Sequence, residues 1–360
     1  MPMNLIQPHT QLIALDWGTS SLRAYRLGVD GQVLDLRSLP WGVMRLPQVA
    51  PAQDSAAQGA QGADDKAGFE LAFEQACGDW LRATPGVPVI AAGMVGSREG
   101  WRETAYLSIP ITAGEIGSKL NTVRTRSGAI VHIVPGLIQN AALPNVMRGE
   151  ETQVIGALCM LDAARHGSRA EHEEVLIGLP GTHSKWVGIR RQGGDMQSRI
   201  EHFSTFMTGE LYAVLCAHSI LGRGMQAGDG GSGDRLAFER GVQVAQSPAG
   251  RMGVLSTIFS TRTLGLTGVL DGAGQREYLS GLLIGHEVAA LKHMLQGQGG
   301  QLARVMLIGD AALCERYTRA LKAYGVEQVD IAAQATERGL WQLALAAGLL
   351  TPGGAMKGQQ

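Results

Sequence analysis

The chain has 360 residues, 45% of them hydrophobic, which suits a globular protein of two domains with sizeable cores. Its net charge of −1 and aromatic share of 5% give no reason to expect binding to nucleic acid or to an anionic membrane. The four cysteines are widely spaced and match neither a zinc site nor a redox pair. We find no signal-peptide pattern and no membrane-spanning apolar stretch, so we expect a cytoplasmic protein.

A strand, a tight turn and a returning strand are predicted over residues 12–27. The turn offers small residues, hydroxyl groups and backbone N–H groups that can hold phosphate oxygens, and it comprises Gly18, Thr19 and Ser20. Asp16 ends the first strand, where its carboxylate could bind the Mg²⁺ that accompanies a nucleotide. The alternative is an ordinary hairpin with a solvated aspartate.

The next segment predicts a strand over 32–40, a loop over 48–68 that shows no periodicity, and an amphipathic helix over 69–81. Residues 87–92 then form an apolar strand that leads into a loop over 93–101. Ligands in α/β sheets bind at the carboxyl ends of strands. This loop is therefore a candidate binding segment, although it could also be a plain connector.

Two adjacent glutamates follow the strand that is predicted over 130–135. Glu150 and Glu151 lie in the first turn of a helix whose apolar positions continue over 153–164. Acidic side chains are favoured there because they complement the helix dipole. One carboxylate is enough to complement the dipole, so the second could serve as a catalytic base. A polar linker over 165–173 then separates the two halves of the chain.

The second half begins with a similar pattern over residues 174–189, in which an apolar strand, a Gly-Thr-x-Ser turn and an alternating strand follow one another. Its turn contains Gly181 and Thr182. Two such hairpins in one chain indicate duplicated half-domains that face one nucleotide.

The rest of the second half predicts a strand over 200–207, helices from 208 and over 277–295, a strand over 302–308 and a closing helix over 337–350. A Gly-rich loop over 227–234 lacks the context of a P-loop, and a Gly/Gln linker spans 296–301. A short strand is also predicted over 328–332. Gly309 and Asp310 follow the strand over 302–308, where Asp310 can cap the next helix.

Several segments resemble known proteins. Residues 16–20 with Arg23, and residues 181–186, are similar to the two phosphate motifs of the actin, Hsp70 and sugar-kinase superfamily. More narrowly, the chain resembles the 2-dehydro-3-deoxygalactonokinase family along nearly its whole length. The segments that carry this narrower resemblance are 92–101, 146–153, 180–186 and 205–212.

The resemblance implies an α/β fold of two ribonuclease-H-like (actin-like ATPase) domains with an interdomain cleft that holds the nucleotide. We place the domains at 1–160 and 172–335, with residues 336–352 as a helix that can return to the first domain. The implied function is ATP- and Mg²⁺-dependent phosphorylation of 2-dehydro-3-deoxy-D-galactonate to its 6-phosphate in galactonate catabolism. The implied partners are the sugar acid and ATP, and a homodimer is compatible with the sequence.

The resemblance also implies roles for individual residues. Asp16 would position Mg²⁺, and Glu151 would be the general base, with Glu150 as its substitute. ATP would contact Gly18, Thr19, Ser20, Gly181, Thr182, Lys185, Gly309 and Asp310. The sugar acid would contact Gly96, Ser97, Arg98, Trp101 and Arg102.

Some of these assignments have alternatives. Lys185 could simply be solvated at its turn. Most sugar kinases of the superfamily use aspartate as the base, so a glutamate departs from the general pattern. Arg98 and Arg102 are the candidates for holding the substrate carboxylate because arginine matches its geometry, and the N–H groups of Gly96 and Ser97 come next.

Two other functional classes fit parts of the sequence. A phosphohydrolase of the same fold, similar to exopolyphosphatases, also pairs glutamates at a helix start. A non-catalytic ATP-dependent binding protein would usually need a further peptide-binding module. A kinase for a related 2-keto-3-deoxy sugar acid is the third alternative.

Overall fold

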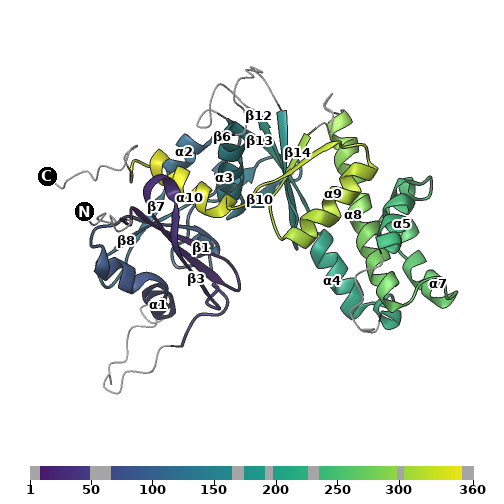
Figure 1. The fold of residues 1–360 in the computed structure, drawn as a ribbon, viewed down its shortest axis with the longest axis horizontal. Coiled ribbons are helices and arrows are strands. Elements are labelled where there is room, and N and C mark those ends of the chain that lie inside the picture. Colours follow the sequence, from purple (N-terminus) through teal and green to yellow (C-terminus); the bar gives the residue numbers. More distant parts are fainter. Residues whose placement is uncertain are drawn as a thin grey trace, which may run out of the picture. The chain divides into compact units, whose positions relative to one another are not determined.

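The structure, a computed structural model, describes residues 9–48, 66–163, 174–190, 198–225, 235–297 and 304–350 (Figure 1). Most of the predicted loop 48–68 lies outside these residues, as do the whole of 165–173 and 227–234. The chain forms two compact units. Unit 1 comprises Met1–Glu173, Ile189–His202 and Ala333–Gln360, and unit 2 comprises Glu174–Gly188 and Phe203–Ala332.

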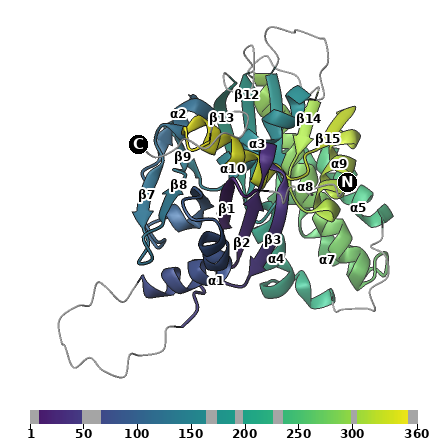
Figure 2. The same ribbon diagram turned by 60° about the vertical axis from the view of Figure 1, so that its left-hand side comes forward.

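Unit 1 is built on a six-stranded sheet with the order β3-β2-β1-β4-β8-β7. Strand β1 runs antiparallel to β2 and parallel to β4, which in turn is parallel to β8, so β1, β4 and β8 end at the same edge. Figure 2 shows β1, β2 and β3 side by side. The strands are β1 (Leu12–Trp17), β2 (Leu22–Leu27), β3 (Val33–Leu39), β4 (Val89–Gly93), β7 (Asn121–Arg124) and β8 (Ile130–Ile133).

Helices cover both faces of this sheet, and the side chains of β1 are therefore buried on both sides. Helix α1 (Ala67–Ala83) packs its aromatic side chains against Ile13, Leu15 and Trp17. Helices α3 (Glu150–Ala163) and α10 (Ala335–Ala346) pack together, with α1 and α10 on opposite sides of β1 (Figures 1 and 2). A Cβ on Gly156 would lie 1.8 Å from the Ala335 carbonyl oxygen, so glycine permits this close approach.

Smaller elements complete unit 1, and the sequence patterns did not predict them. Strands β5, β9 and β10 form a three-stranded sheet, and β6 pairs with the first residues of β13. Their bounds are β5 (Leu107–Ser108), β6 (Ile111–Thr112), β9 (Leu137–Gln139), β10 (Asn145–Met147), α2 (Ala113–Gly117), η1 (Val29–Gly31) and η2 (Met94–Gly96).

Unit 2 repeats the central strand order of unit 1. Its strands lie in the order β15-β14-β11-β12-β13, with β11, β14 and β15 parallel, so that both units have the first hairpin, a third strand beside it and two parallel strands on the other side. The strands are β11 (Glu174–Leu179), β12 (Ser184–Arg190), β13 (Arg199–Phe206), β14 (Arg304–Leu307) and β15 (Gln328–Ile331). This is a duplicated ribonuclease-H-like α/β fold, which confirms the predicted fold class.

The core of unit 2 lies between its sheet and the helices α5, α8 and α9, with Trp186 and Tyr317 fully buried in it. Helix α8 extends two residues into the predicted linker 296–301. The helices are α4 (Thr208–His218), α5 (Arg235–Gln246), α6 (Val254–Thr257), α7 (Ser260–Leu266), α8 (Gly272–Gly297), α9 (Ala311–Ala323), η3 (Gly222–Gly224) and η4 (Gly250–Met252).

The unit boundaries differ from the predicted domains most at one internal segment, and by two or three residues at either end of the second domain. Residues Ile189–His202 cluster with unit 1, whereas the sequence analysis places all of 172–335 in the second domain. The physical reason is the pairing of Arg199 and Ile200 with strand β6 of unit 1. Helix α10 also belongs to unit 1 and packs against α3 there.

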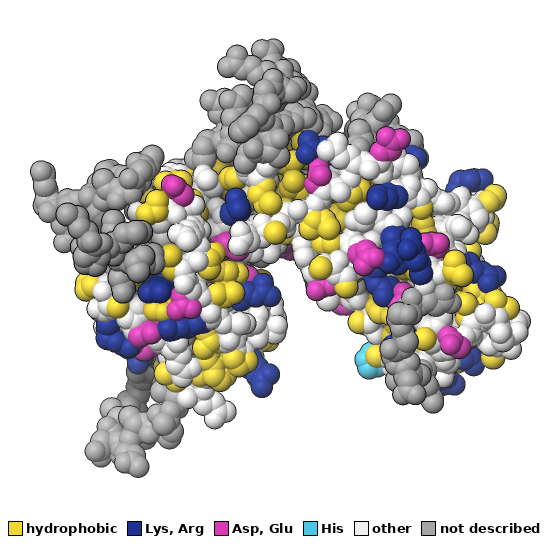
Figure 3. All heavy atoms as spheres, viewed as in Figure 1, with side chains coloured by type: hydrophobic (Ala, Val, Ile, Leu, Met, Phe, Trp, Pro, Cys, Tyr) yellow, Lys and Arg dark blue, Asp and Glu magenta, His cyan; other side chains and the backbone are white. Residues whose placement is uncertain are grey.

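The surface carries both signs of charge. On the face drawn in Figure 3, basic and acidic side chains are interspersed on each unit. Among the described residues, no helix is long and apolar enough to cross a membrane.

Candidate functional site

Three segments meet at one edge of the unit 1 sheet. Asp16 and Trp17 at the end of β1 pair with Ala92 and Gly93 of β4. Gly93 has a φ of 95°, and a Cβ there would lie 2.7 Å from the Trp17 carbonyl oxygen. Gly149, with a φ of 108°, packs on Gly93, since its Cβ would lie 3.2 Å from the Gly93 Cα. The two glycines therefore bring Asp16, the loop after β4 and the start of α3 together.

The charge of Asp16 lacks full compensation. Burial raises the pKa of Asp16, the nearby Glu337 adds to this increase, and Arg23 lowers it in part. The Arg23 Nη1 lies 3.7 Å from the Asp16 Oδ2, and more than half of the Arg23 side chain is exposed. A carboxylate whose ionised form is disfavoured in this way can gain from a bound cation.

Glu150 and Glu151 differ sharply in burial. Glu150 is half-buried and its Oε2 accepts a hydrogen bond from the Arg148 N–H at 3.0 Å. Glu151 is 0% exposed, and both of its carboxyl oxygens accept from the Gly149 N–H, at 2.7 and 2.9 Å. Burial and the charge of Glu150 raise the pKa of Glu151 to about 8. A substrate can therefore reach Glu150 in this structure, whereas Glu151 is enclosed.

The raised pKa of Glu151 predicts a pH-dependent stability. A carboxyl group whose pKa is higher in the folded state than in the unfolded state stabilises the fold below its unfolded pKa, and this stability is lost as the pH rises toward 8. The free energy of unfolding should fall by up to about 1.4 kcal/mol per pH unit relative to a Glu151→Gln variant. Urea unfolding of both proteins between pH 5 and 8 measures this difference. A free energy of unfolding that changes with pH in the same way in both proteins would contradict this prediction.

The loop after β4 separates into exposed and buried residues. Arg98 and Arg102 are exposed, whereas Gly96 and Ser97 are buried. Trp101 is 1% exposed and stacks on Phe69 in the core, with an interplanar angle of 10°. The structure therefore moves Trp101 from the predicted substrate-binding set into the core.

The turn of the first hairpin is held by the chain that follows β3. The carbonyl oxygens of Gly18 and Thr19 accept hydrogen bonds from the N–H groups of Val43 and Met44, at 3.0 and 3.1 Å. Thr19 and Ser20 are exposed at the same turn. These backbone contacts fix the turn while leaving its hydroxyl groups in solvent.

A cavity of about 350 Å³ lies in unit 2 beside the second hairpin turn. Gly181 and Thr182 line it from the turn, and Thr208 and Gly209 line it from the start of α4. A Cβ on Gly209 would lie 2.4 Å from the Gly181 carbonyl oxygen, so glycine lets the helix start contact the turn. The N-terminus of a helix favours anions such as phosphate. The other lining residues are Tyr212, Ser280, Leu283, Ile284, Leu313, Arg316 and Tyr317.

A buried carboxyl group supports this cavity. Burial raises the pKa of Glu287. Its Oε2 accepts from the Tyr317 hydroxyl at 2.7 Å, and its Oε1 accepts from the Trp186 Nε1–H at 2.6 Å. Arg316, which also lines the cavity, forms a two-pronged ion pair with Glu277. These contacts fix the side chains of α9 that line the cavity.

Lys185 does not lie in the turn. It belongs to strand β12, is 6% exposed, and its Nζ donates to the Thr205 Oγ1 at 2.7 Å. The interpretation of Lys185 as a solvated turn residue is therefore wrong. The reason is that β12 is buried on both faces, so Lys185 is enclosed whichever face its side chain takes.

Gly309 and Asp310 are not among the residues that line the cavity. The Asp310 Oδ1 accepts from the N–H groups of Ala312 and Leu313, at 3.0 and 3.1 Å, and so caps α9. The capping role expected from the sequence is confirmed. Contact with a nucleoside stays a prediction.

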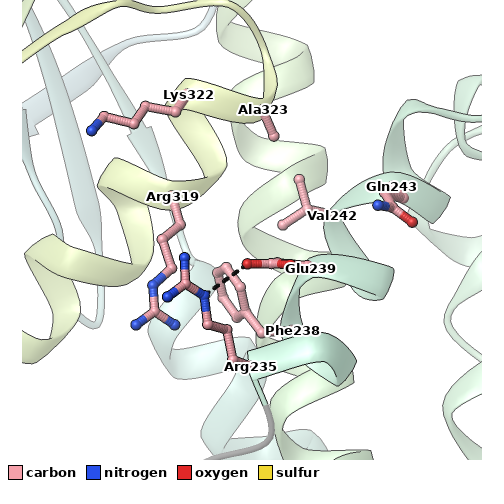
Figure 4. A pocket seen from close by; sticks show the side chains of 8 residues that line it. All are labelled: Arg235, Phe238, Glu239, Val242, Gln243, Arg319, Lys322 and Ala323. Carbon is pink, nitrogen blue, oxygen red and sulfur yellow. Dashed lines mark hydrogen bonds and ion pairs between the residues drawn. The ribbon is translucent and has the colours of Figure 1, made fainter.

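A second hollow of unit 2, about 310 Å³ in volume, lies between α5 and α9 (Figure 4). Its two arginines are paired, Arg235 with Glu239 at 2.9 Å and Arg319 with Glu315. Lys322 extends away from Val242 and Gln243 in this view. None of the predicted phosphate-binding residues lines it, so the larger cavity is the candidate nucleotide site.

Sequence reasoning did not assign several residues to the site. Tyr212, Ser280, Arg316 and Tyr317 lie on helices whose facing surfaces become clear only in the folded unit. The sequence did offer a sign of Thr208 and Gly209, because a small polar residue and a glycine at the start of a helix are typical of an anion-binding site. It also offered one of Arg148, because that residue lies two residues before the first of the two glutamates.

Comparisons with known proteins identify the family of the chain. Residues 16–343 match the family model of 2-keto-3-deoxy-galactonokinase. A protein of Rhizobium meliloti, named a probable 2-dehydro-3-deoxygalactonokinase, is 33% identical over 92% of this chain and 97% of its own length. The 2-dehydro-3-deoxygalactonokinase of Escherichia coli is 34% identical over 89% of this chain and 92% of its own. A crystal structure of a proposed 2-dehydro-3-deoxygalactonokinase from Sinorhizobium meliloti superposes with a TM-score of 0.74, at 33% identity, over 93% of this chain and 98% of that one.

Proposed function

The chain belongs to the 2-keto-3-deoxy-galactonokinase family, and from this we propose how its residues phosphorylate 2-dehydro-3-deoxy-D-galactonate at the expense of ATP in galactonate catabolism. The observation that carries the proposal is the family match together with the second hairpin turn, which lines a cavity of about 350 Å³. The use of ATP points to the cytoplasm as the compartment of the reaction.

Unit 2 binds the nucleotide in the cavity of about 350 Å³. The N–H groups and hydroxyls of Gly181, Thr182 and Thr208 contact phosphate oxygens, as the start of α4 favours. Gly18 and the exposed Thr19 and Ser20 offer the same kinds of group at the first hairpin turn of unit 1. Lys185 contributes its charge from within strand β12, and Gly309 and Asp310 would contact the nucleoside beyond the residues that line the cavity.

Asp16 fits the requirements of a magnesium ligand. Mg²⁺ usually keeps several waters and takes one or two protein carboxylates together with substrate phosphates. Asp16 offers one carboxylate, and its raised pKa reflects a charge without full compensation. When bound, Mg²⁺ neutralises charge on the transferring phosphoryl group.

One of the two glutamates takes the proton of the attacking hydroxyl of the sugar acid. The exposure of Glu150 supports it as the base that contacts the substrate. Glu151 then fixes the turn before α3 through the Gly149 N–H. This reverses the order of preference from the sequence analysis, because the enclosed Glu151 carboxylate has no access to a hydroxyl.

A coupled ADP-release assay tests the proposed function. We expect rapid ADP release with ATP, Mg²⁺ and 2-dehydro-3-deoxy-D-galactonate, and release at least about a hundredfold slower without the sugar acid, since the acceptor hydroxyl is then missing. A panel of other 2-keto-3-deoxy sugar acids measures the preference. Equal loss of ATP with and without any sugar acid would contradict the proposal and favour a phosphohydrolase.

A further inference from the structure

Arg148 lies directly between strand β10 and the turn that precedes the two glutamates. Its guanidinium stacks on the Tyr106 ring, 4.3 Å from the centroid, and its Nη2 donates to the Thr104 carbonyl oxygen at 2.9 Å. Its Nη1 donates to the Thr104 hydroxyl. The side chain is thus half-buried and held in one place beside Glu150.

The charge of this guanidinium has no carboxylate ion-pair partner within the described residues. Three other partly buried arginines have one: Arg37 pairs with Asp79, Arg304 with Asp330, and Arg316 with Glu277. Arg276, also partly buried, donates instead to the Met225 carbonyl oxygen. Arginine carries five N–H donors, and Thr104 uses two of them. Three donors of Arg148 therefore remain.

Two polar atoms near this point lack hydrogen-bond partners. They are the Arg148 Nε and the Ser97 Oγ, and Ser97 is only 7% exposed. A buried polar group without a partner costs about 1–3 kcal/mol, and folded proteins seldom leave one unexplained. Ser97 follows Gly96, whose Cβ, if present, would lie 3.0 Å from the Arg148 Nη1 and 2.8 Å from the Thr104 Oγ1. Ser97 and the Arg148 guanidinium are therefore neighbours across Gly96, and each contributes one polar atom without a partner.

The chemistry of the substrate explains this cluster. A sugar acid brings a carboxylate to an edge of the sheet that already holds Asp16, Glu150 and Glu151. A fixed cation is needed to offset that repulsion, and the planar guanidinium matches a carboxylate better than any other side chain. Arg98 and Arg102 are exposed and their side chains are not placed by comparable contacts in this structure.

We propose that Arg148, with the hydroxyl of Ser97, forms the subsite that binds the carboxylate of the sugar acid. The proposal rests on the proposed function, and it replaces Arg98 and Arg102 as the carboxylate-binding residues. Arg148 then sets the preference for acids over neutral sugars, while Glu150 acts on the hydroxyl that is phosphorylated.

The test compares Arg148→Met, Arg148→Lys and Ser97→Ala with wild type, and uses Arg124→Met on strand β7 as a matched control. Arg148→Met should raise the KM for the sugar acid about ten- to a hundredfold and leave the KM for ATP within about twofold, because a charge-assisted hydrogen bond to the acid is lost. It should also narrow, by a similar factor, the preference for the acid over the corresponding neutral sugar. Arg148→Lys should lie in between, since it keeps the charge without the fork, and Ser97→Ala should raise only the KM for the acid.

Several outcomes would overturn the subsite. They are an unchanged KM for the acid in folded Arg148→Met, an equal loss of activity toward acid and neutral sugar, or a large rise in KM in Arg98→Met or Arg102→Met instead. If Arg148→Met does not fold, as judged by its melting temperature, Arg148→Lys and Ser97→Ala decide by the same criteria. Failure of wild type to phosphorylate any sugar acid would instead refute the proposed function, so the two failures are distinguishable.

Discussion

Replacing Asp16 by asparagine should lower kcat by at least about a hundredfold, which corresponds to a loss of a few kcal/mol of electrostatic stabilisation in the transition state. The substitution keeps the shape of the side chain at the end of β1 and removes its charge. Since Arg23 lies 3.7 Å away and offsets the buried charge only in part, the ionised carboxylate is available to a cation. Steady-state turnover at saturating ATP and sugar acid, over a series of Mg²⁺ concentrations, measures the effect.

Asp35→Asn is a suitable control, because Asp35 lies in strand β3 of the same sheet and faces the backbone N–H of its neighbour Leu36. We expect turnover near that of wild type in this control. The Asp16 variant should also need more Mg²⁺ for half-maximal activity. Turnover near wild type in Asp16→Asn at saturating Mg²⁺ would refute the assignment of Asp16 as the metal ligand.

Glu150→Gln should reduce kcat by about 10² to 10⁴, the usual contribution of a general base, with little change in the KM for ATP. The reason is access, since Glu150 is partly exposed in the first turn of α3 while Glu151 is fully enclosed. Glutamine keeps the length and most of the packing of the side chain, so the loss should reside in proton transfer. Pre-steady-state and steady-state rates at saturating substrates measure it.

Glu151→Gln and the exposed Glu327→Gln complete this comparison. Glu327→Gln should leave turnover unchanged, and Glu151→Gln should lose less than Glu150→Gln while altering the pH dependence of stability described above. If the two effects on kcat are reversed, Glu151 is the base and the enclosed carboxylate must become accessible during the reaction. If neither variant loses turnover, the base lies outside this helix.

Much of the fold is visible in local patterns. The apolar and alternating runs of both hairpins and the amphipathic pattern of α1 correspond to elements of the structure. These patterns are strong because each strand or helix must bury one defined face. Strands of two or three residues, such as β5 and β9, are too short for a periodic signal.

The site was harder to predict than the fold because it depends on contacts between distant segments. Trp101 follows a strand end and so resembled a ligand contact, but its neighbours Trp17 and Phe73 come from other elements. Lys185 was assigned to a turn, where it could be solvated, yet it lies in a strand that is enclosed on both faces. Arg316 and Tyr317 reach the cavity through the packing of α9 on α8, which no local pattern encodes.

Unit 1 is made of three separate stretches of chain, and its helix α10 comes from the last of them. During synthesis on the ribosome, the sheet of unit 1 therefore emerges long before the helix that covers it. The face of β1 and β4 that contacts α10 is not covered by it until residues 335–346 emerge, and unit 2, which ends at Ala332, has left the exit tunnel by then. A nascent chain stalled before residue 335 would expose that apolar surface. Although most of unit 1 is synthesised first, we therefore expect it to need protection by chaperones until synthesis ends.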